Sequence, residues 1–392
     1  MTLPTTEIIT SNQGVADLCA AVRATGWFAF DTEFVMETSY QAEVCLVQVA
    51  TESRIALIDP LAGAELDEVW ALVVDPDVEC IVHAGSEDLA ICHRSTGKTP
   101  VNVFDSQVVA GMVGSDYPMS LLRLVNEVTG VRLHKSQTLT DWRARPLADV
   151  QIEYAAEDVG YLPHVRKHLG ERLATLGREA WARDELSKFE CPATYDRQPA
   201  QEVLRLKGAR SLDGQQLAVV RELLKLREQM ARQRNRPART VIRDHLLIEI
   251  ARHKWTDPAQ IRTLRGLQLP MRALGELGDA VKRALAVPRD EWPQRAPTTK
   301  PDSRADTLVS LLSAAVRDYC AERELAYALL TTKQQLTGVV ETFLRNGGLV
   351  DANEILPGWR GDAIGSLLAD LLTGRRAVRV GTAAQNHRLV VE

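Results

Sequence analysis

The chain lacks the features that would place it in or beyond a membrane. None of its apolar runs is long enough to span a bilayer, and its first residues carry no basic stretch like that of a secretory signal. Its six cysteines are scattered and form no Cys-x-x-Cys pair, which argues against a zinc site or a disulfide framework. We therefore expect a cytoplasmic protein with reduced thiols, no membrane association and no disulfide partner.

The small net charge of −5 hides a segregation of charge along the chain. Residues 1–200 hold 16 Lys and Arg against 30 Asp and Glu, whereas residues 201–300 hold 21 against 11. Residues 301–392 are nearly balanced, with 10 against 11. The middle segment therefore supplies the positive surface that nucleic-acid phosphates require. A length of 392 residues suggests two or three domains.

Two acids follow an aromatic, apolar run at residues 27–30 that predicts a short buried strand. Asp31 and Glu33 would share one face of that strand, because side chains alternate along it. At ~4 Å and an effective dielectric of ~20, two like charges repel by about 4 kcal/mol. A hard divalent cation with oxygen ligands would relieve this repulsion.

A third acid follows a second predicted strand, at residues 79–83. Gly85 permits a tight turn there, and Ser86 is expected to cap the helix that comes next. Asp88 would then lie in the first helical turn, where the helix dipole favours a negative charge.

A tyrosine and a fourth acid lie in a predicted helix over residues 151–165. Tyr154 and Asp158 are four residues apart and share one helix face. With a hydroxyl pKa of ~10, Tyr154 is a poor proton acceptor and is better suited to orienting a water molecule.

Each cluster alone has an ordinary explanation. The strand acids suit a solvated edge, Asp88 suits a helix start, and Tyr154 with Asp158 suits a surface pair. Their conjunction, in this order, indicates a two-metal phosphodiesterase site.

These stretches resemble the DEDD superfamily of 3′→5′ exonucleases, in its tyrosine-bearing subclass, and within it the ribonuclease D family. The matching residues are 28–34, 83–89 and 154–159. A further match is Lys135-Ser136 followed by residues 141–147, although His134 stands where the family often has an acid. The resemblance covers residues 1–190 strongly and 205–290 moderately.

The resemblance implies a metal-dependent enzyme that hydrolyses RNA from its 3′ end and releases 5′-monophosphates, with tRNA precursors among its expected substrates. It implies that two divalent ions, Mg²⁺ or Mn²⁺, are held by four acids and that Tyr154 positions the attacking water. The implied ligands are Asp31, Glu33, Asp88 and Asp158. Trp142 and Arg145 are expected to touch the substrate; the alternative is a packed tryptophan and a solvated arginine.

Two other functions stay open. A DNA exonuclease of the same superfamily would share the chemistry, and sensitivity to the 2′-hydroxyl would distinguish it. A non-catalytic RNA-binding protein would bind RNA without metal-dependent turnover, but the complete acidic set argues against it.

The first domain, residues 1–190, is expected to have an α/β ribonuclease-H-like fold with a mixed sheet. Residues 51–54 would turn between two strands of a hairpin, and residues 191–199 would form a linker. The expected strands are 27–33, 43–50, 54–58, 79–83 and 101–104. The expected helices are 65–74, 86–95, 119–128 and 149–176.

One or two small all-α, HRDC-like domains are expected to follow, with a linker at residues 288–302. Residues 205–290 resemble the HRDC domain, and residues 303–392 are a candidate second, divergent copy. The evidence for a repeat is a set of matches at a constant offset of 90, such as Leu246 with Leu336.

A basic turn at residues 232–239 interrupts the first of these domains. Its arginines are predicted to contact RNA phosphates, with a solvated charged turn as the alternative. They are Arg232, Arg234, Arg236 and Arg239.

Overall fold

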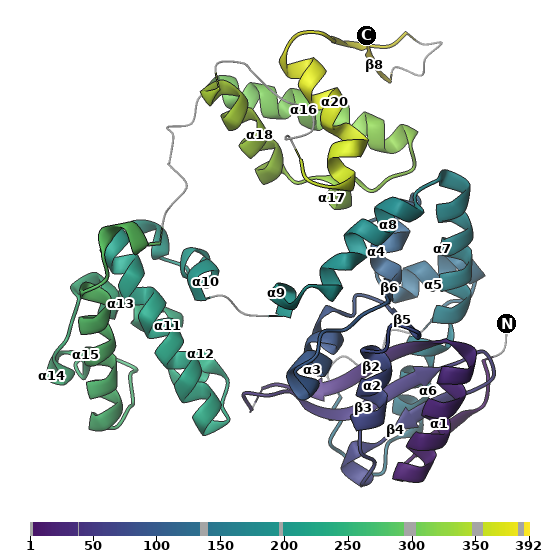
Figure 1. The fold of residues 1–392 in the computed structure, drawn as a ribbon, viewed down its shortest axis with the longest axis horizontal. Helices are drawn as coiled ribbons and strands as arrows, with labels where there is room; N and C mark the ends of the chain where they lie inside the picture. The colour runs from purple at the N-terminus through teal and green to yellow at the C-terminus, as the bar shows by residue number, and fades with distance from the viewer. Residues whose placement is uncertain are drawn as a thin grey trace. The chain divides into compact units, whose positions relative to one another are not determined.

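The computed structural model describes residues 3–37, 39–133, 140–195, 199–293, 303–346, 356–382 and 388–392. These residues divide into two compact units (Figure 1). One comprises Met1–Glu33, Cys45–Thr194 and Lys300–Glu392, and the other Phe34–Val44 and Tyr195–Thr299. The sequence match at His134, Lys135 and Ser136 lies outside the described residues. No helix among the described residues has the length and apolar character needed to cross a bilayer.

A six-stranded mixed sheet forms the centre of the first unit, in the order β1-β4-β3-β2-β5-β6. The strands β2, β3 and β4 form the expected meander, with Ala50 paired to Ile55 across the predicted hairpin turn. The pairs β1–β4, β2–β5 and β5–β6 are parallel. This confirms the α/β fold class. The strands are β1 (Thr6–Ile9), β2 (Trp27–Val35), β3 (Glu43–Ala50), β4 (Ile55–Ile58), β5 (Glu79–Val82) and β6 (Val103–Asp105).

Helices cover the sheet (Figure 1), and the side chains of β2 show how its two faces differ. Phe30 packs edge-on against Trp70 with ring centroids 6.0 Å apart, so the even-numbered residues face the helix α2. The odd-numbered face carries Asp31 and Glu33. The helices of this part are α1 (Asn12–Thr25), α2 (Asp67–Val73), α3 (Ser86–Thr96), α4 (Ser106–Met112), α5 (Leu121–Thr129), α6 (Asp149–Gly160), α7 (Leu162–Leu176) and α8 (Glu179–Leu186).

Several local expectations are wrong. The single helix expected at 149–176 is two helices, α6 and α7, which meet at Tyr161; Pro163 occupies the first turn of α7, where its missing N–H costs nothing. Gly85, not Ser86, is the N-cap of α3. The segment 191–199 is not a plain linker, because α9 (Pro192–Tyr195) lies within it and α10 (Pro199–Arg205) begins at its end. Sequence reasoning also missed β1, α1 and α4.

The second unit is helical, as expected, around a core of buried Leu, Ile and Val side chains. The predicted basic turn is shorter than expected, since α11 continues through Arg234 and ends at Asn235 in the left-handed region. Arg232 and Arg234 therefore lie on the last helical turn. The remaining helices of this unit are α11 (Gly214–Arg234), α12 (Ala238–Val241), α13 (Asp244–His253), α14 (Pro258–Ile261) and α15 (Met271–Leu285).

The last ninety residues repeat a similar series of helices and add a small hairpin. A long helix, a single turn and a medium helix succeed one another in both series, yet a second HRDC-like domain stays a prediction. The elements are α16 (Ser303–Glu322), α17 (Tyr327–Leu330), α18 (Lys333–Arg345), α20 (Trp359–Leu372), β7 (Val378–Val380) and β8 (Leu389–Val391).

Polar contacts hold this C-terminal region to the rest of the first unit. Glu185 of α8 accepts hydrogen bonds from Trp359 Nε1 at 2.9 Å and from Arg360 Nη1 at 2.6 Å. The buried Arg178 donates to the carbonyl oxygens of Met112 and Glu324, the latter at 2.8 Å. The C-terminal region thus has a packing surface on α8.

Candidate active site

Strand β2 places Asp31 and Glu33 on one face, as the alternation predicts. Burial raises the pKa of Glu33 to about 8, and the nearby Asp158 and Asp88 contribute to that rise. The pKa of Asp31 is also raised, first by burial and then by the charges of Asp88, Asp158 and Glu33. The acids from three distant parts of the sequence are therefore electrostatic neighbours.

Asp88 is positioned by a turn that sequence reasoning only partly anticipated. Ala84 adopts a left-handed conformation with φ of 56°, and a Cβ at Gly85 would lie 2.6 Å from the Cβ of Val82. Asp105 accepts hydrogen bonds from the backbone N–H groups of Ala84 at 3.1 Å and Gly85 at 3.2 Å. This carboxylate fixes the turn from which α3 starts.

The hydroxyl of Thr32 donates a hydrogen bond to Asp88 Oδ1. Burial raises the pKa of Asp88, and the bond from Thr32 partly offsets that increase because it favours the charged carboxylate. Thr32 thus links β2 to α3. Nothing in the sequence pattern indicated this role, whereas Asp105, an acid just before a helix, carried the signal of an N-cap residue.

Tyr154 and Asp158 lie on one face of α6 and hydrogen-bond to each other. Burial raises the pKa of Asp158 to about 7, against the lowering effect of the bond from Tyr154. The pKa of Tyr154 is raised by burial and by Asp158, Glu33 and Asp31. Tyr154 therefore keeps its proton and acts as a hydrogen-bond donor.

The cluster suits hard cations. Asp158 Oδ2 is buried and has no hydrogen-bond partner in the described structure, and a buried carboxylate oxygen without a partner is costly unless a cation or donor meets it. All four acids have raised pKa values. Among the described residues, however, no three acidic, histidine or cysteine side chains already form a ready metal-binding group.

Trp142 and Arg145 make protein contacts. Trp142 is 5% exposed, and its ring lies 6.1 Å from that of Tyr154, which agrees with the packed alternative. Arg145 is not solvated. Its Nε and Nη2 bind the carboxylate of Asp59 at 2.5 and 2.7 Å, and its other N–H groups donate to the carbonyl oxygens of Cys45, Trp142 and Ala144.

The bonds of Arg145 occupy all five of its N–H donors. No donor remains for a phosphate in this arrangement, which argues against the expected contact between this residue and RNA; that contact stays a prediction. Arg145 instead anchors the segment carrying Trp142, which packs against Tyr154.

The four arginines of the second unit are all exposed. Arg232 donates to the Tyr40 hydroxyl at 3.2 Å, and Arg239 lies 3.2 Å from Asp244 Oδ2. Arg234 and Arg236 have no ion pair with a described residue. These two therefore present the least compensated charge.

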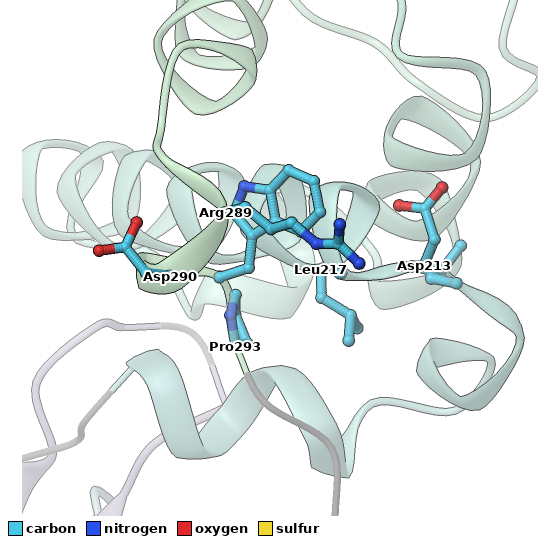
Figure 2. A pocket seen from close by; sticks show the side chains of 8 residues that line it. Asp213, Leu217, Arg289, Asp290 and Pro293 are labelled. Carbon is cyan, nitrogen blue, oxygen red and sulfur yellow. The ribbon is translucent and has the colours of Figure 1, made fainter.

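Two cavities of the second unit differ in charge. One of about 790 Å³ is lined by Asp213, Arg289, Asp290 and the apolar Leu217 and Pro293, among others (Figure 2). Its acids outnumber its single cation, so it does not suit a phosphate.

The other cavity, of about 670 Å³, is lined by five basic or histidine side chains and two acids. It adjoins the start of α13, whose N-cap residue, Arg243, provides no side-chain cap. Lys207 and Arg243 are exposed there and make no ion pair with a described residue. This arrangement is chemically suited to an anion.

The fold and the acidic site together define a class, the 3′→5′ exonucleases, and the comparisons agree. A family model described as 3′-5′ exonuclease matches residues 6–174, and one described as HRDC domain matches residues 216–272. Both fall within regions for which the sequence predicted these relationships.

The chain is 32% identical to a ribonuclease D of Sphingobium indicum, over 95% of this chain and 96% of that one. It is 33% identical to a ribonuclease D of Pseudomonas paraeruginosa, over 95% and 99%. The crystal structure of Escherichia coli RNase D, described as an exoribonuclease involved in structured RNA processing, matches with a TM-score of 0.78 and 29% identity, over 94% and 99%.

The chain therefore belongs to the ribonuclease D family. Its activity is that of a 3′→5′ exoribonuclease, as the resemblance predicted. The family's exonuclease chemistry is metal-dependent.

Proposed function

We propose that Asp31, Glu33, Asp88 and Asp158 hold two divalent ions, Mg²⁺ or Mn²⁺, and that Tyr154 orients the attacking water. The observation that carries this proposal is the buried acid cluster, with its mutually raised pKa values and the unpartnered Asp158 Oδ2. When bound, such ions would neutralise the acids and stabilise charge on the phosphate in the transition state.

The residues of the chain contribute orientation. Tyr154 has a raised pKa and donates its one O–H to Asp158, so it holds a water molecule by accepting a hydrogen bond and does not remove the water's proton. Thr32 and Asp105 fix Asp88 from two sides, and Trp142 limits the movement of Tyr154. Mg²⁺ commonly binds one or two carboxylates together with substrate phosphate, so small movements of these side chains on RNA binding would complete the site.

The proposed substrates are structured RNAs with a free 3′ end, including tRNA precursors. The similarity to Escherichia coli RNase D, described as acting in structured RNA processing, supports this class. The basic surface of the second unit supports binding of the RNA body: Arg232, Arg234, Arg236 and Arg239 are exposed, and the cavity beside Lys207 and Arg243 suits phosphates.

The catalytic proposal is tested with a 5′-labelled RNA that has a 3′ tail, in Mg²⁺ or in EDTA, beside an Asp31→Asn variant. We expect a ladder that shortens from the 3′ end, and both EDTA and the substitution should abolish it. A tRNA precursor with a 3′ trailer and a DNA of the same sequence complete the comparison. Turnover by Asp31→Asn at the wild-type rate would contradict the assigned role.

The RNA-binding proposal is tested by the salt dependence of affinity. Replacing Arg234 and Arg236 with Ala should lower the slope of log K against log salt by about 0.7–0.9 for each phosphate that the variant no longer binds. Arg232→Ala is the matched comparison, because Arg232 also donates to Tyr40 and should contribute less. An unchanged slope in both variants would remove this surface from the RNA-binding site.

A further inference from the structure

A cavity of about 590 Å³ in the first unit has no part in the proposed chemistry. It lies at the starts of β2 and β5 and at the first turns of α7. The lining residues that matter here are Trp27, Glu52, Glu79, His164, Arg166 and Lys167.

This cavity is separate from the acidic cluster. Trp27 begins β2 and Asp31 lies four residues further on, which corresponds to about 13 Å along a strand. None of the four acids, nor Tyr154, lines the cavity. A molecule bound here would therefore leave the proposed metal ligands free.

One wall of the cavity is held in place by an ion pair between Arg166 and Glu79. Arg166 binds both carboxylate oxygens of Glu79, at 2.8 and 2.9 Å, and its guanidinium lies 4.5 Å from the centre of the Phe104 ring. A bidentate, stacked arginine of this kind has little freedom to move. The wall is thus rigid, and its two charges cancel.

The remaining polar groups of the cavity are a lysine and a histidine on α7 and a glutamate on a turn. Lys167 and His164 are exposed, lie within one turn of each other on α7 and have no ion pair with a described residue. Glu52, on the turn between β3 and β4, is also exposed and unpaired among the described residues. The half-buried Trp27 adds an aromatic surface.

We propose that this cavity binds a free nucleoside 5′-monophosphate. Lys167 and His164 contact the phosphate, the indole of Trp27 packs against the base, and Glu52 accepts hydrogen bonds from a base amine or a ribose hydroxyl. Stacking on an aromatic side chain is available to every base, and the cavity volume lies in the usual range for small ligands. The inference rests on the proposed function only in that the reaction supplies this ligand as its product.

The test is isothermal titration calorimetry of the full chain in EDTA, with 5′-AMP and 5′-GMP as ligands and adenosine and inorganic phosphate as controls. EDTA removes metal-dependent binding at the acidic cluster. We expect sub-millimolar binding of the monophosphates and a loss of about tenfold or more in Lys167→Ala, which corresponds to ~1.4 kcal/mol. Glu52→Gln should weaken binding as well.

Two matched variants make the test specific. Lys98→Ala removes another exposed lysine of the same unit, outside the cavity, and Asp31→Asn disables the acidic cluster; both should bind the monophosphates as the wild type does. No binding at ~1 mM, equal affinity in Lys167→Ala and wild type, or binding lost in Asp31→Asn would overturn the proposal. The proposal would also be overturned if Lys167→Ala changed the affinity for RNA and left the affinity for the monophosphates unchanged.

The failures of the two proposals are distinguishable. RNA shortening in Mg²⁺ without monophosphate binding in EDTA would refute this inference and leave the catalytic proposal intact. Monophosphate binding in EDTA without RNA shortening in Mg²⁺ would refute the catalytic proposal and leave this inference intact.

Discussion

Raising the pH should destabilise the metal-free protein, because its acidic cluster takes up protons on folding. Asp158 has a folded pKa of about 7 and Glu33 of about 8, whereas unfolded carboxyl groups titrate near pH ~4. Between these values the folded chain holds more protons than the unfolded chain. The stabilisation is therefore complete below pH ~4 and is lost as the pH rises through the folded pKa values.

The size of this loss in unfolding free energy follows from the pKa shift of Asp158. Its pKa rises from 3.8 to about 7, and at 1.36 kcal/mol per unit this shift corresponds to ~4 kcal/mol. Partial exposure and solvent screening reduce the effect to ~2 kcal/mol. For a domain of this size, 1 kcal/mol shifts Tm by about 2–4 °C. About 60% of this loss falls between pH 5 and pH 8, so we expect Asp158 to lower Tm by ~2–5 °C over that interval.

Scanning calorimetry in EDTA at pH 5 and pH 8 measures the effect as a difference between wild type and Asp158→Asn. The wild type should lose ~2–5 °C more than the variant, since asparagine does not titrate. Asp149→Asn is the matched control, because Asp149 is an exposed acid at the start of the same helix. Adding Mg²⁺ at pH 8 should raise Tm in the wild type more than in Asp158→Asn.

Parallel Tm curves for wild type and Asp158→Asn would refute the reasoning, because Asp158 would then titrate equally in both states. A smaller pH effect in Asp149→Asn than in Asp158→Asn would place the responsible groups elsewhere.

Three further predictions concern groups that hold the site and the C-terminal region in place. Tyr154→Phe should fold normally and lose ~10²–10⁴ in turnover rate by analogy with positioned proton-handling groups, whereas Tyr161→Phe should retain activity; near-wild-type turnover of Tyr154→Phe would show that it does not orient water. Arg145→Ala should leave the buried Asp59 without its cationic partner and cost ~3 kcal/mol of unfolding free energy in calorimetry, and an unchanged Tm would contradict the anchoring role. Glu185→Ala should increase hydrogen exchange across α20, because it removes the acceptor for two bonds from that helix; unchanged protection would mean that apolar packing alone holds it.

The sequence alone was sufficient to predict the acidic set and its strand and helix contexts. Asp31 and Glu33 share a face because of strand alternation, and Tyr154 and Asp158 share one because of helical spacing. Both relations are local, so they survive any error in the tertiary arrangement. The ribonuclease-H-like sheet followed because buried strands and helices alternate along the chain. The short elements β1 and α4 were missed, and so was the longer α1, although Ser11 and Gly26 carry its cap signals.

Local pattern failed where a side chain serves a distant segment. Arg145 looked like a free cation, yet it lies beside Asp59, 86 residues away, and binds it. The N-cap of α3 fell at Gly85 because Asp105, from another strand end, holds the turn. Of the predicted phosphate-binding arginines, Arg232 and Arg239 have protein partners that no spacing rule reveals.

The sequence by itself thus determined which faces the groups of the proposed site occupy, because periodicity fixes the faces on which side chains stand. Only the tertiary structure decided how these groups are charged and held. Burial and the convergence of β2, α3 and α6 raise the pKa values of the acids, and these effects depend on distances between residues far apart in the chain. The cavity beside Trp27 and Lys167 likewise exists only because β2, β5 and α7 meet.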